Sequence, residues 1–150
     1  MQRTLILCKP DGVQRRLVGE LIGRFERKGL RLVGLKLVAA GRDLAERHYA
    51  VHQGKPFYES LVGFITSGPT VAMVWEGREA VTVARNLMGP TDGAKAPPGT
   101  IRGDFAASIQ NNLAHGSDSP DNAAAEIALW FRADELINWS PVDSAWVTAG

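Results

Sequence analysis

The sequence lacks the features that mark secreted, membrane-spanning or nucleic-acid-wrapping proteins. Cys8 is its one cysteine, so no internal disulfide can form, and its apolar neighbours predict a small buried side chain. The apolar runs, such as residues 71–75, are far too short to span a bilayer. No long apolar stretch with a cleavage site follows Met1. We therefore expect a cytoplasmic protein with no membrane partner.

An excess of either charge is also missing. The chain has 17 Lys and Arg residues against 16 Asp and Glu residues, which leaves a formal net charge of +1. This balance excludes a polybasic surface wrapped around DNA, so any phosphate site must come from local clustering. The 150 residues are 45% hydrophobic and 22% charged, and we expect residues 1–150 to form one globular domain.

Apolar periodicity and turn residues predict that strands and helices alternate along the chain. Short apolar runs predict strands at residues 4–8, 30–39, 70–75 and 111–115. Helical spacing predicts helices over residues 18–28, 43–52, 57–65, 78–88 and 120–131. A turn is predicted at residues 9–12, and an irregular loop at residues 89–104. A ferredoxin-like α/β fold, with a four-stranded antiparallel sheet and helices on one face, accommodates this order best.

Two helix starts and the C-terminal segment carry more specific signals. Asp43 and Glu46 have the spacing of a capping box, and Ser119 followed by proline predicts the cap of the last helix. The residues after Trp139 have no regular pattern. Because a tryptophan exposed in a free tail is unfavourable, Trp146 predicts that this tail packs on a neighbouring subunit.

The sharpest candidate for chemistry is a histidine at the end of the last predicted strand. His115 is followed by glycine, serine and aspartate and leads to a helix N-terminus, a setting that favours anions. With an ordinary pKa of about 6.5, an imidazole is mostly an unprotonated nucleophile at neutral pH. Glu126 lies at the edge of an apolar helix stripe, where the ring N–H of His115 is a natural partner. The alternative is a structural histidine and a solvated glutamate.

A second candidate is a group of donors that suits phosphate. Arg85, Thr91 and Arg102 flank the long predicted loop, and Lys9 follows the first strand. Arginine forks, a hydroxyl and a lysine point charge are the groups that phosphoryl transfer needs, because its catalysis is largely placement and charge neutralisation. Taken singly, each of these side chains is more often a solvated surface group.

An aromatic pair and two incomplete motifs remain. Phe57 or Tyr58 can project from its helix and stack on a base, although core packing is the default for either ring. Residues 89–95 lack the spacing and the Lys-Ser/Thr pair of a P-loop. His48 and His52 lack the glutamate of a zinc protease helix. No acidic cluster offers a dedicated metal cage, so a divalent ion would be carried by substrate phosphates.

Several separated motifs together resemble one known family. They are Asn-Leu-Ala-His-Gly-Ser-Asp-Ser at 112–119, Lys-Pro-Asp-Gly-Val at 9–13, His-Tyr at 48–49, Lys-Pro-Phe at 55–57 and Pro-Gly-Thr-Ile-Arg-Gly-Asp-Phe at 98–105. From end to end the chain is similar to nucleoside diphosphate kinases. The resemblance implies a ferredoxin-like fold and a ping-pong transfer of the γ-phosphate of a nucleoside triphosphate, mainly ATP, to a nucleoside diphosphate.

The resemblance also implies a role for each matching residue. His115 corresponds to the phosphorylated nucleophile, with the phosphate on Nδ1, and Glu126 to the carboxylate that orients the other ring nitrogen. Ser117 and Tyr49 correspond to the hydrogen-bonding neighbours in the family's site. The family's phosphate-binding side chains are matched here by Lys9, Arg85, Thr91 and Arg102. Phe57 corresponds to the base-stacking ring, and Asn112 to a ribose-contacting amide, with Lys9 also touching the sugar.

Cofactor and assembly follow from the same resemblance. The implied cofactor is Mg²⁺, which we expect to be bound to the nucleotide phosphates and not to dedicated protein ligands. Family members assemble as homo-oligomers, and an arm at about 139–150 resembles that of the hexamers, so a hexamer is favoured over a tetramer. Differences from the family pattern are Tyr58, Pro90, Gly93 and Ala114, none of which removes a catalytic side chain.

Two other readings and one geometric difficulty accompany this interpretation. A nucleic-acid binder on the same fold would carry aromatic residues on its central strands, but residues 4–8 and 30–39 have none. A regulatory protein without turnover would not be expected to keep His115 and Glu126 together with the cationic group.

Strict strand alternation puts Asn112 and His115 on opposite faces, so we expect a bend between them.

Overall fold

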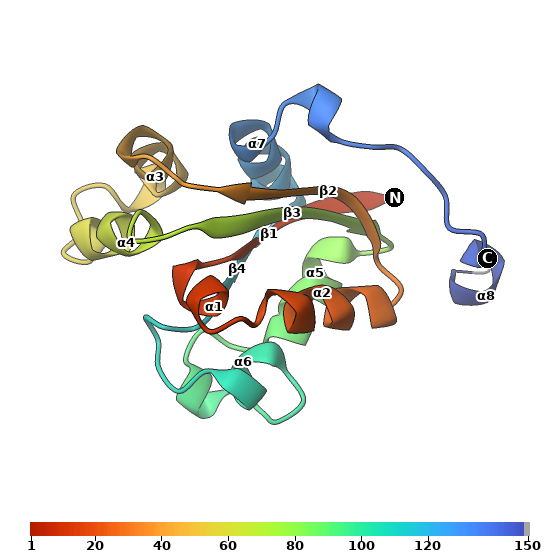
Figure 1. Cartoon of the computed structure of the whole chain (residues 1–150), viewed down its shortest axis with the longest axis horizontal. Helices are drawn as coiled ribbons and strands as arrows, with labels where there is room; N and C mark the ends of the chain where they lie inside the picture. Colours follow the sequence, from red (N-terminus) through yellow and green to blue (C-terminus); the bar gives the residue numbers. More distant parts are fainter. Residues whose placement is uncertain (149–150) are drawn as a thin grey trace.

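Four strands form one antiparallel sheet in the order β2-β3-β1-β4 (Figure 1). β1 (Gln2–Cys8) pairs with β3 (Thr70–Gly77) on one side and with β4 (Ala114–Gly116) on the other, and β3 pairs with β2 (Arg31–Val38). The computed structural model describes residues 1–148. Within them, the strand order and directions confirm the predicted ferredoxin-like sheet.

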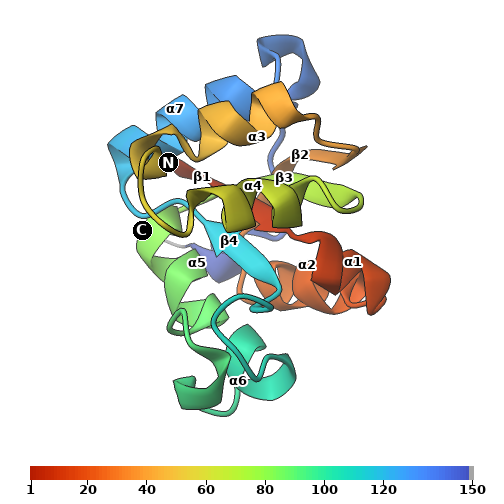
Figure 2. The same ribbon diagram turned by 90° about the vertical axis from the view of Figure 1, so that its left-hand side faces the viewer.

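Helices cover both faces of the sheet, so the prediction that they lie on one face was wrong (Figure 2). One core contains Ile6 and Cys8 of β1 and is covered by α2 (Val18–Arg27), α5 (Ala80–Met88) and α6 (Ile101–Phe105). The other contains Leu5 and Leu7 and is covered by α3 (Arg42–His48), α4 (Tyr58–Ile65) and α7 (Pro120–Trp130). Because successive strand residues point to opposite faces, the continuous apolar runs of β1 and β3 require cover on each side.

Several local predictions are confirmed. The helix predicted over residues 18–28 is α2, and the chain leaves it through Gly29, whose φ of +99° is a conformation that glycine tolerates. At the start of α7, the Ser119 hydroxyl accepts the backbone N–H of Asn122 at 3.1 Å. Cys8 is fully buried, and burial raises the pKa of its thiol to about 12, so this cysteine is unreactive near neutral pH.

Two predictions at helix starts were wrong. Residues 9–12 do not form a simple turn but lead into α1 (Pro10–Gln14), because proline at the first helical position presets the helical φ. Asp43 and Glu46 form no capping box. Each instead forms an i,i+4 ion pair along α3: Asp43 with Arg47 at 3.4 Å and Glu46 with Arg42 at 2.6 Å.

Other boundaries also differ from the predictions. The α3 helix ends at His48, and His52 belongs to a separate 3₁₀ turn, η1 (Ala50–His52). The predicted loop at 89–104 contains η2 (Gly93–Lys95) and the start of α6, which the Thr100 hydroxyl caps by accepting the N–H of Gly103 at 2.9 Å. The last strand begins at Ala114 instead of residue 111.

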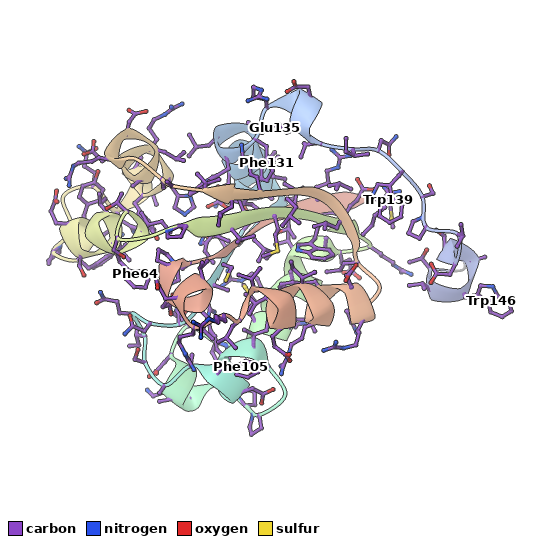
Figure 3. The ribbon with its side chains drawn as sticks, in the orientation of Figure 1. Phe64, Phe105, Phe131, Glu135, Trp139 and Trp146 are labelled. Atoms are coloured by element: carbon purple, nitrogen blue, oxygen red, sulfur yellow. The ribbon has the colours of Figure 1, made fainter. Side chains whose placement is uncertain are left out.

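After η3 (Ala133–Glu135), the C-terminal segment runs along the protein's own β2 strand before α8 (Ser144–Val147). The Ile137 N–H donates to the Val33 carbonyl and the Trp139 indole N–H to the Leu32 carbonyl, both at 2.8 Å. Trp146 is 91% exposed at the far end of this segment (Figure 3). Its packing on a neighbouring subunit stays a prediction, and the last two residues of the predicted arm, 149 and 150, lie outside the described part of the chain.

None of the helices within residues 1–148 is both long enough and apolar enough to cross a membrane.

Candidate active site

The predicted site residues converge on a cavity of about 790 Å³ beside β4 and α7. Seven of them line it: Lys9, Tyr49, Arg85, Thr91, Arg102, His115 and Glu126. Residues that lie almost 120 positions apart in the sequence therefore share one concave surface. Three more predicted residues, Phe57, Asn112 and Ser117, contact this lining without being part of it.

A left-handed residue supplies the expected bend before β4. Leu113 has a φ of +75°, and its side chain is fully buried. Its N–H donates to Asp11 Oδ2 at 3.0 Å, and its carbonyl accepts the N–H of Lys9 at 2.8 Å. The bend lets Asn112 reach the loop after β1, where its Oδ1 accepts from Lys9 Nζ at 2.5 Å. Of the two side chains that alternation would separate, His115 lines the cavity and Asn112 contacts its lining through Lys9.

Close approach of the backbone explains Gly12 in this corner. A Cβ atom at this position would lie 2.6 Å from the Cys8 sulfur and 3.3 Å from the Leu113 carbonyl oxygen. Any side chain here would push α1 away from the bend that carries Asn112.

His115 is held through one ring nitrogen and leaves the other one available. Its Nε2 lies 3.0 Å from Glu126 Oε2, and the second carboxylate oxygen accepts the Ser117 hydroxyl at 2.6 Å. Because a carboxylate only accepts hydrogen bonds, the proton of the neutral ring is assigned to Nε2 and the lone pair to Nδ1. Burial alone would raise the pKa of Glu126, but the contacts with His115 and Ser117 outweigh it, so its pKa lies below the ordinary value.

A second histidine stands behind the first. The ring of His48 packs edge-on against His115, with centroids 4.6 Å apart, and against Tyr49, with centroids 4.7 Å apart. Burial, with a smaller contribution from His115, lowers the pKa of His48 to about 3, so this ring is neutral at physiological pH. Tyr49 is also buried, and burial raises the pKa of its hydroxyl to about 12. Tyr49 and His115 thus both contact the ring of His48.

The two arginines of the cavity differ in how many of their hydrogen-bond donors are already engaged by the protein. Arg102 is buried and donates to the carbonyls of Asn112, Gly89 and Ala114 at 3.2, 2.9 and 2.6 Å. Burial, with a contribution from Arg85, lowers its pKa to about 10. Arg85 is exposed and donates to one acceptor among residues 1–148, the Gly116 carbonyl, at 3.1 Å. Both arginines line the cavity, but Arg102 has three donors bound to backbone carbonyls around β4, whereas Arg85 has one.

Lys9 is a second buried cation of the site, beside Arg102. Burial lowers the pKa of its amine to about 8, although the charge of Asp11 acts in the opposite direction. A bound anion would supply the counter-charge that this buried amine lacks.

Phe57 lies at the rim. It is 46% exposed, and its ring centroid is 5.2 Å from that of His52, a residue of the cavity lining. Lys55 Nζ lies 5.8 Å from the same ring. The ring can therefore reach a ligand that extends out of the cavity, while Tyr58 packs against the core on the α4 side.

Comparisons with known proteins agree with this geometry. The family model described as nucleoside diphosphate kinase matches residues 2–136. A nucleoside diphosphate kinase of Picosynechococcus sp. is 60% identical over 147 residues, which cover 98% of this chain and 99% of that protein. The chain belongs to the nucleoside diphosphate kinase family.

Further relatives and solved structures extend the comparison. The nucleoside diphosphate kinase of Carboxydothermus hydrogenoformans is 56% identical over 147 residues, covering 98% of this chain and 99% of that protein. The structure of a halophilic nucleoside diphosphate kinase from Halobacterium salinarum, in complex with CDP, superimposes with a TM-score of 0.95 at 52% identity and covers 97% of each chain. As a member of the family, the chain is a phosphotransferase that passes a phosphate from a nucleoside triphosphate to a nucleoside diphosphate.

The site of this nucleoside diphosphate kinase contains three residues whose contacts there were not predicted from the sequence. His48 was assigned no role beyond an incomplete zinc motif and a place in a family motif. Trp130 was only part of a predicted helix, and Asp11 only part of a predicted turn. The signal for His48 was its place beside Tyr49 in a family motif. The contacts of Trp130 and Asp11 join segments far apart in the sequence and could not be found from local patterns.

Metal ligands are scarce in the cavity of this kinase. Within residues 1–148, the one group of three or more His, Cys, Asp or Glu residues whose potential ligand atoms lie within 4.8 Å of one another is His48, His115 and Glu126. The Nδ1 of His48 is already occupied by Trp130, and both Glu126 oxygens by His115 and Ser117. Mg²⁺ prefers oxygen ligands in octahedral geometry, which this trio does not offer. This trio is therefore not suited to be a dedicated Mg²⁺ site.

Proposed function

We propose that this nucleoside diphosphate kinase works in two half-reactions, with the phosphate carried on Nδ1 of His115 between them. The observation that supports this proposal is the hydrogen bond between His115 Nε2 and Glu126. It fixes the ring proton on Nε2 and keeps the Nδ1 lone pair available as a nucleophile.

In the first half-reaction, Nδ1 attacks the γ-phosphorus and the bond from phosphorus to the β,γ-bridging oxygen breaks. The nucleoside diphosphate leaves with that electron pair, and the ring gains positive charge. Glu126, held by Ser117, stabilises the charge without taking the proton. In the second half-reaction, a terminal oxygen of the acceptor diphosphate attacks the phosphorus, and the P–N bond breaks to restore neutral His115.

The remaining side chains of the site bind the nucleotide. We assign the phosphates to Lys9, Arg85, Thr91 and Arg102, and the ribose to Asn112 together with Lys9. Phe57 stacks on the base, and a ring that stacks reads no base edges, so the enzyme accepts different nucleosides. Mg²⁺ supplies charge neutralisation on the phosphates when it is bound. The CDP complex of the Halobacterium salinarum relative supports binding of a diphosphate in this fold.

We also propose that the enzyme is a cytoplasmic homo-oligomer, with a hexamer favoured over a tetramer. Exposed apolar side chains support association, since Leu35 and Leu37 on the edge strand β2 are 49% and 68% exposed and Trp146 is 91% exposed. The oligomeric state can be measured by sedimentation or by light scattering coupled to size-exclusion chromatography.

The proposed intermediate is tested by incubating the protein with γ-labelled ATP and Mg²⁺ in the absence of an acceptor. We expect label that is lost in acid, survives alkali and moves to added GDP. His115→Ala should take up no label, whereas Ser67→Ala, an exposed hydroxyl outside the cavity, should be labelled normally. Label that persists in His115→Ala would disprove the assignment of the nucleophile.

A further inference from the structure

Trp130 and His48 form a buried hydrogen bond behind the proposed nucleophile. The indole Nε1 lies 3.1 Å from His48 Nδ1, and Trp130 is only 3% exposed. The two residues come from α7 and α3, 82 positions apart. Trp130 also stands one helical turn after Glu126, so the same face of α7 carries the partners of both histidines.

This bond determines where His48 keeps its proton. An indole N–H can only donate, so the ring nitrogen that faces it must accept. The single proton of the neutral His48 ring is therefore on Nε2, and Nδ1 has none to give. Burial keeps the ring neutral, as the low pKa of His48 indicates.

The protonation of His48 matters because of its distance from Glu126. His48 Nδ1 lies 4.0 Å from Glu126 Oε2, the oxygen that accepts the hydrogen bond of His115 at 3.0 Å. A proton on Nδ1 of His48 would turn it into a second donor for this oxygen after a small ring movement. His48 would then compete with His115 for the carboxylate.

We propose that the Trp130–His48 hydrogen bond is a positioning device that locks His48 in the tautomer unable to donate to Glu126, and so reserves Oε2 for His115. Both are positioning residues in this role, because they act through Glu126 and His115. The His48 ring also packs edge-on against the His115 ring, with an interplanar angle of 81°, and so restricts the orientation of His115. The inference rests on the proposed function of His115 as the phosphorylated nucleophile.

The first test needs no variant. Nitrogen-15 NMR of the histidine rings distinguishes a protonated from an unprotonated Nδ1, and we expect His48 in the Nε2–H form across neutral pH. A protonated Nδ1 in the wild-type protein would overturn the inference.

The second test removes the donor but keeps an aromatic ring. In Trp130→Phe, His48 should shift toward the Nδ1–H tautomer, and single-turnover phosphorylation of His115 should slow by about tenfold, the factor of one ordinary hydrogen bond. The KM for nucleotide should stay unchanged, because no nucleotide contact is removed. The matched control is Trp75→Phe, since Trp75 is fully buried in the opposite core and its N–H has no partner within the described residues.

A rescue separates competition from packing. The double variant Trp130→Phe/His48→Phe has no histidine that competes with His115 for Glu126 Oε2, while Ser117 still donates to Oε1, so it should recover most of the rate lost in Trp130→Phe. If Trp130→Phe behaves like Trp75→Phe, or if the double variant is no faster than Trp130→Phe, the inference is wrong. If wild-type His115 takes up no phosphate at all, the proposed function fails instead, while the NMR result still reports the tautomer.

Discussion

The Asp11 carboxylate accepts a hydrogen bond from the backbone of Leu113, a residue in the left-handed region that is distant in sequence. Its Oδ2 accepts the Leu113 N–H at 3.0 Å, across 102 positions, at a φ of +75°. A non-glycine residue at such a φ costs about 1–2 kcal/mol and persists only where its surroundings hold it. The pairing therefore ties α1 to the strand that carries His115.

Removing the Asp11 acceptor should destabilise the fold and slow catalysis. In Asp11→Ala, the N–H of buried Leu113 loses its partner, which we expect to lower the free energy of unfolding by about 1–3 kcal/mol. The exchange rate should fall with it, because Asn112 and Lys9 depend on the same bend. Chemical denaturation and steady-state kinetics measure the two effects. Asp43→Ala is the control, since the Asp43 side chain is 87% exposed, and equal stability of the two variants would contradict the assigned role.

Neutralising Glu126 should affect chemistry more than binding. Glu126→Gln keeps an oxygen near His115 Nε2 but removes the charge that stabilises the ring as it is phosphorylated. By analogy with the loss of one preorganised transition-state contact, kcat should drop by about a hundredfold with little change in KM. Rapid-quench measurement of phosphohistidine formation provides the test, and an unchanged rate would argue against electrostatic stabilisation by Glu126.

The depressed pKa of Glu126 also predicts how stability depends on pH. Its folded-state pKa lies below its ordinary value, so the unfolded chain binds the proton more tightly. Glu126 therefore adds stability above the pKa of the unfolded chain, and this contribution is lost as the pH falls through the folded pKa. Denaturation of the wild type and of Glu126→Gln on the acid side should show converging stabilities. Parallel curves would contradict the assigned pKa direction.

The sheet was predictable because its central strands are buried on both faces. Such strands read as unbroken apolar runs, which mark them clearly in the sequence. The same property explains why one helical layer was the wrong prediction: a strand that is apolar on both faces needs helices on each side of the sheet. Within the site, His115 and Glu126 could be paired because a carboxylate on an apolar stripe requires a partner.

The parts of the site that could not be predicted depend on contacts between distant segments. The left-handed Leu113 is stabilised by Asp11, and no local preference of leucine indicates that conformation. Arg102 directs three hydrogen bonds to backbone carbonyls, and these acceptors are known only once the chain is folded. The tautomer of His48 likewise depends on Trp130, from another helix.

Truncating Phe57 should weaken the binding of nucleotides by a similar factor whichever base they carry. Base stacking contributes roughly 1–3 kcal/mol, so Phe57→Ala should raise the Kd of ADP, GDP and CDP by a similar factor within that range. Because Phe57 is half exposed at the rim, the variant should keep its stability. Calorimetric titration with the three diphosphates serves as an internal control, and a loss confined to one base would indicate edge recognition instead of stacking.

Lys9 should make diphosphate binding depend on pH on the alkaline side. Its folded-state pKa of about 8 lies below the ordinary 10.5, so the folded protein without nucleotide releases this proton first. Between these values the unfolded chain holds the extra proton, so the stability of the nucleotide-free protein should rise with pH across that window. ADP favours the charged amine, so its affinity should fall as the pH rises through about 8. Lys9→Met should bind ADP more weakly and lose this pH dependence, whereas Lys55→Met, at the exposed rim, should retain it. An alkaline decline in affinity that survives in Lys9→Met would show that a different group titrates.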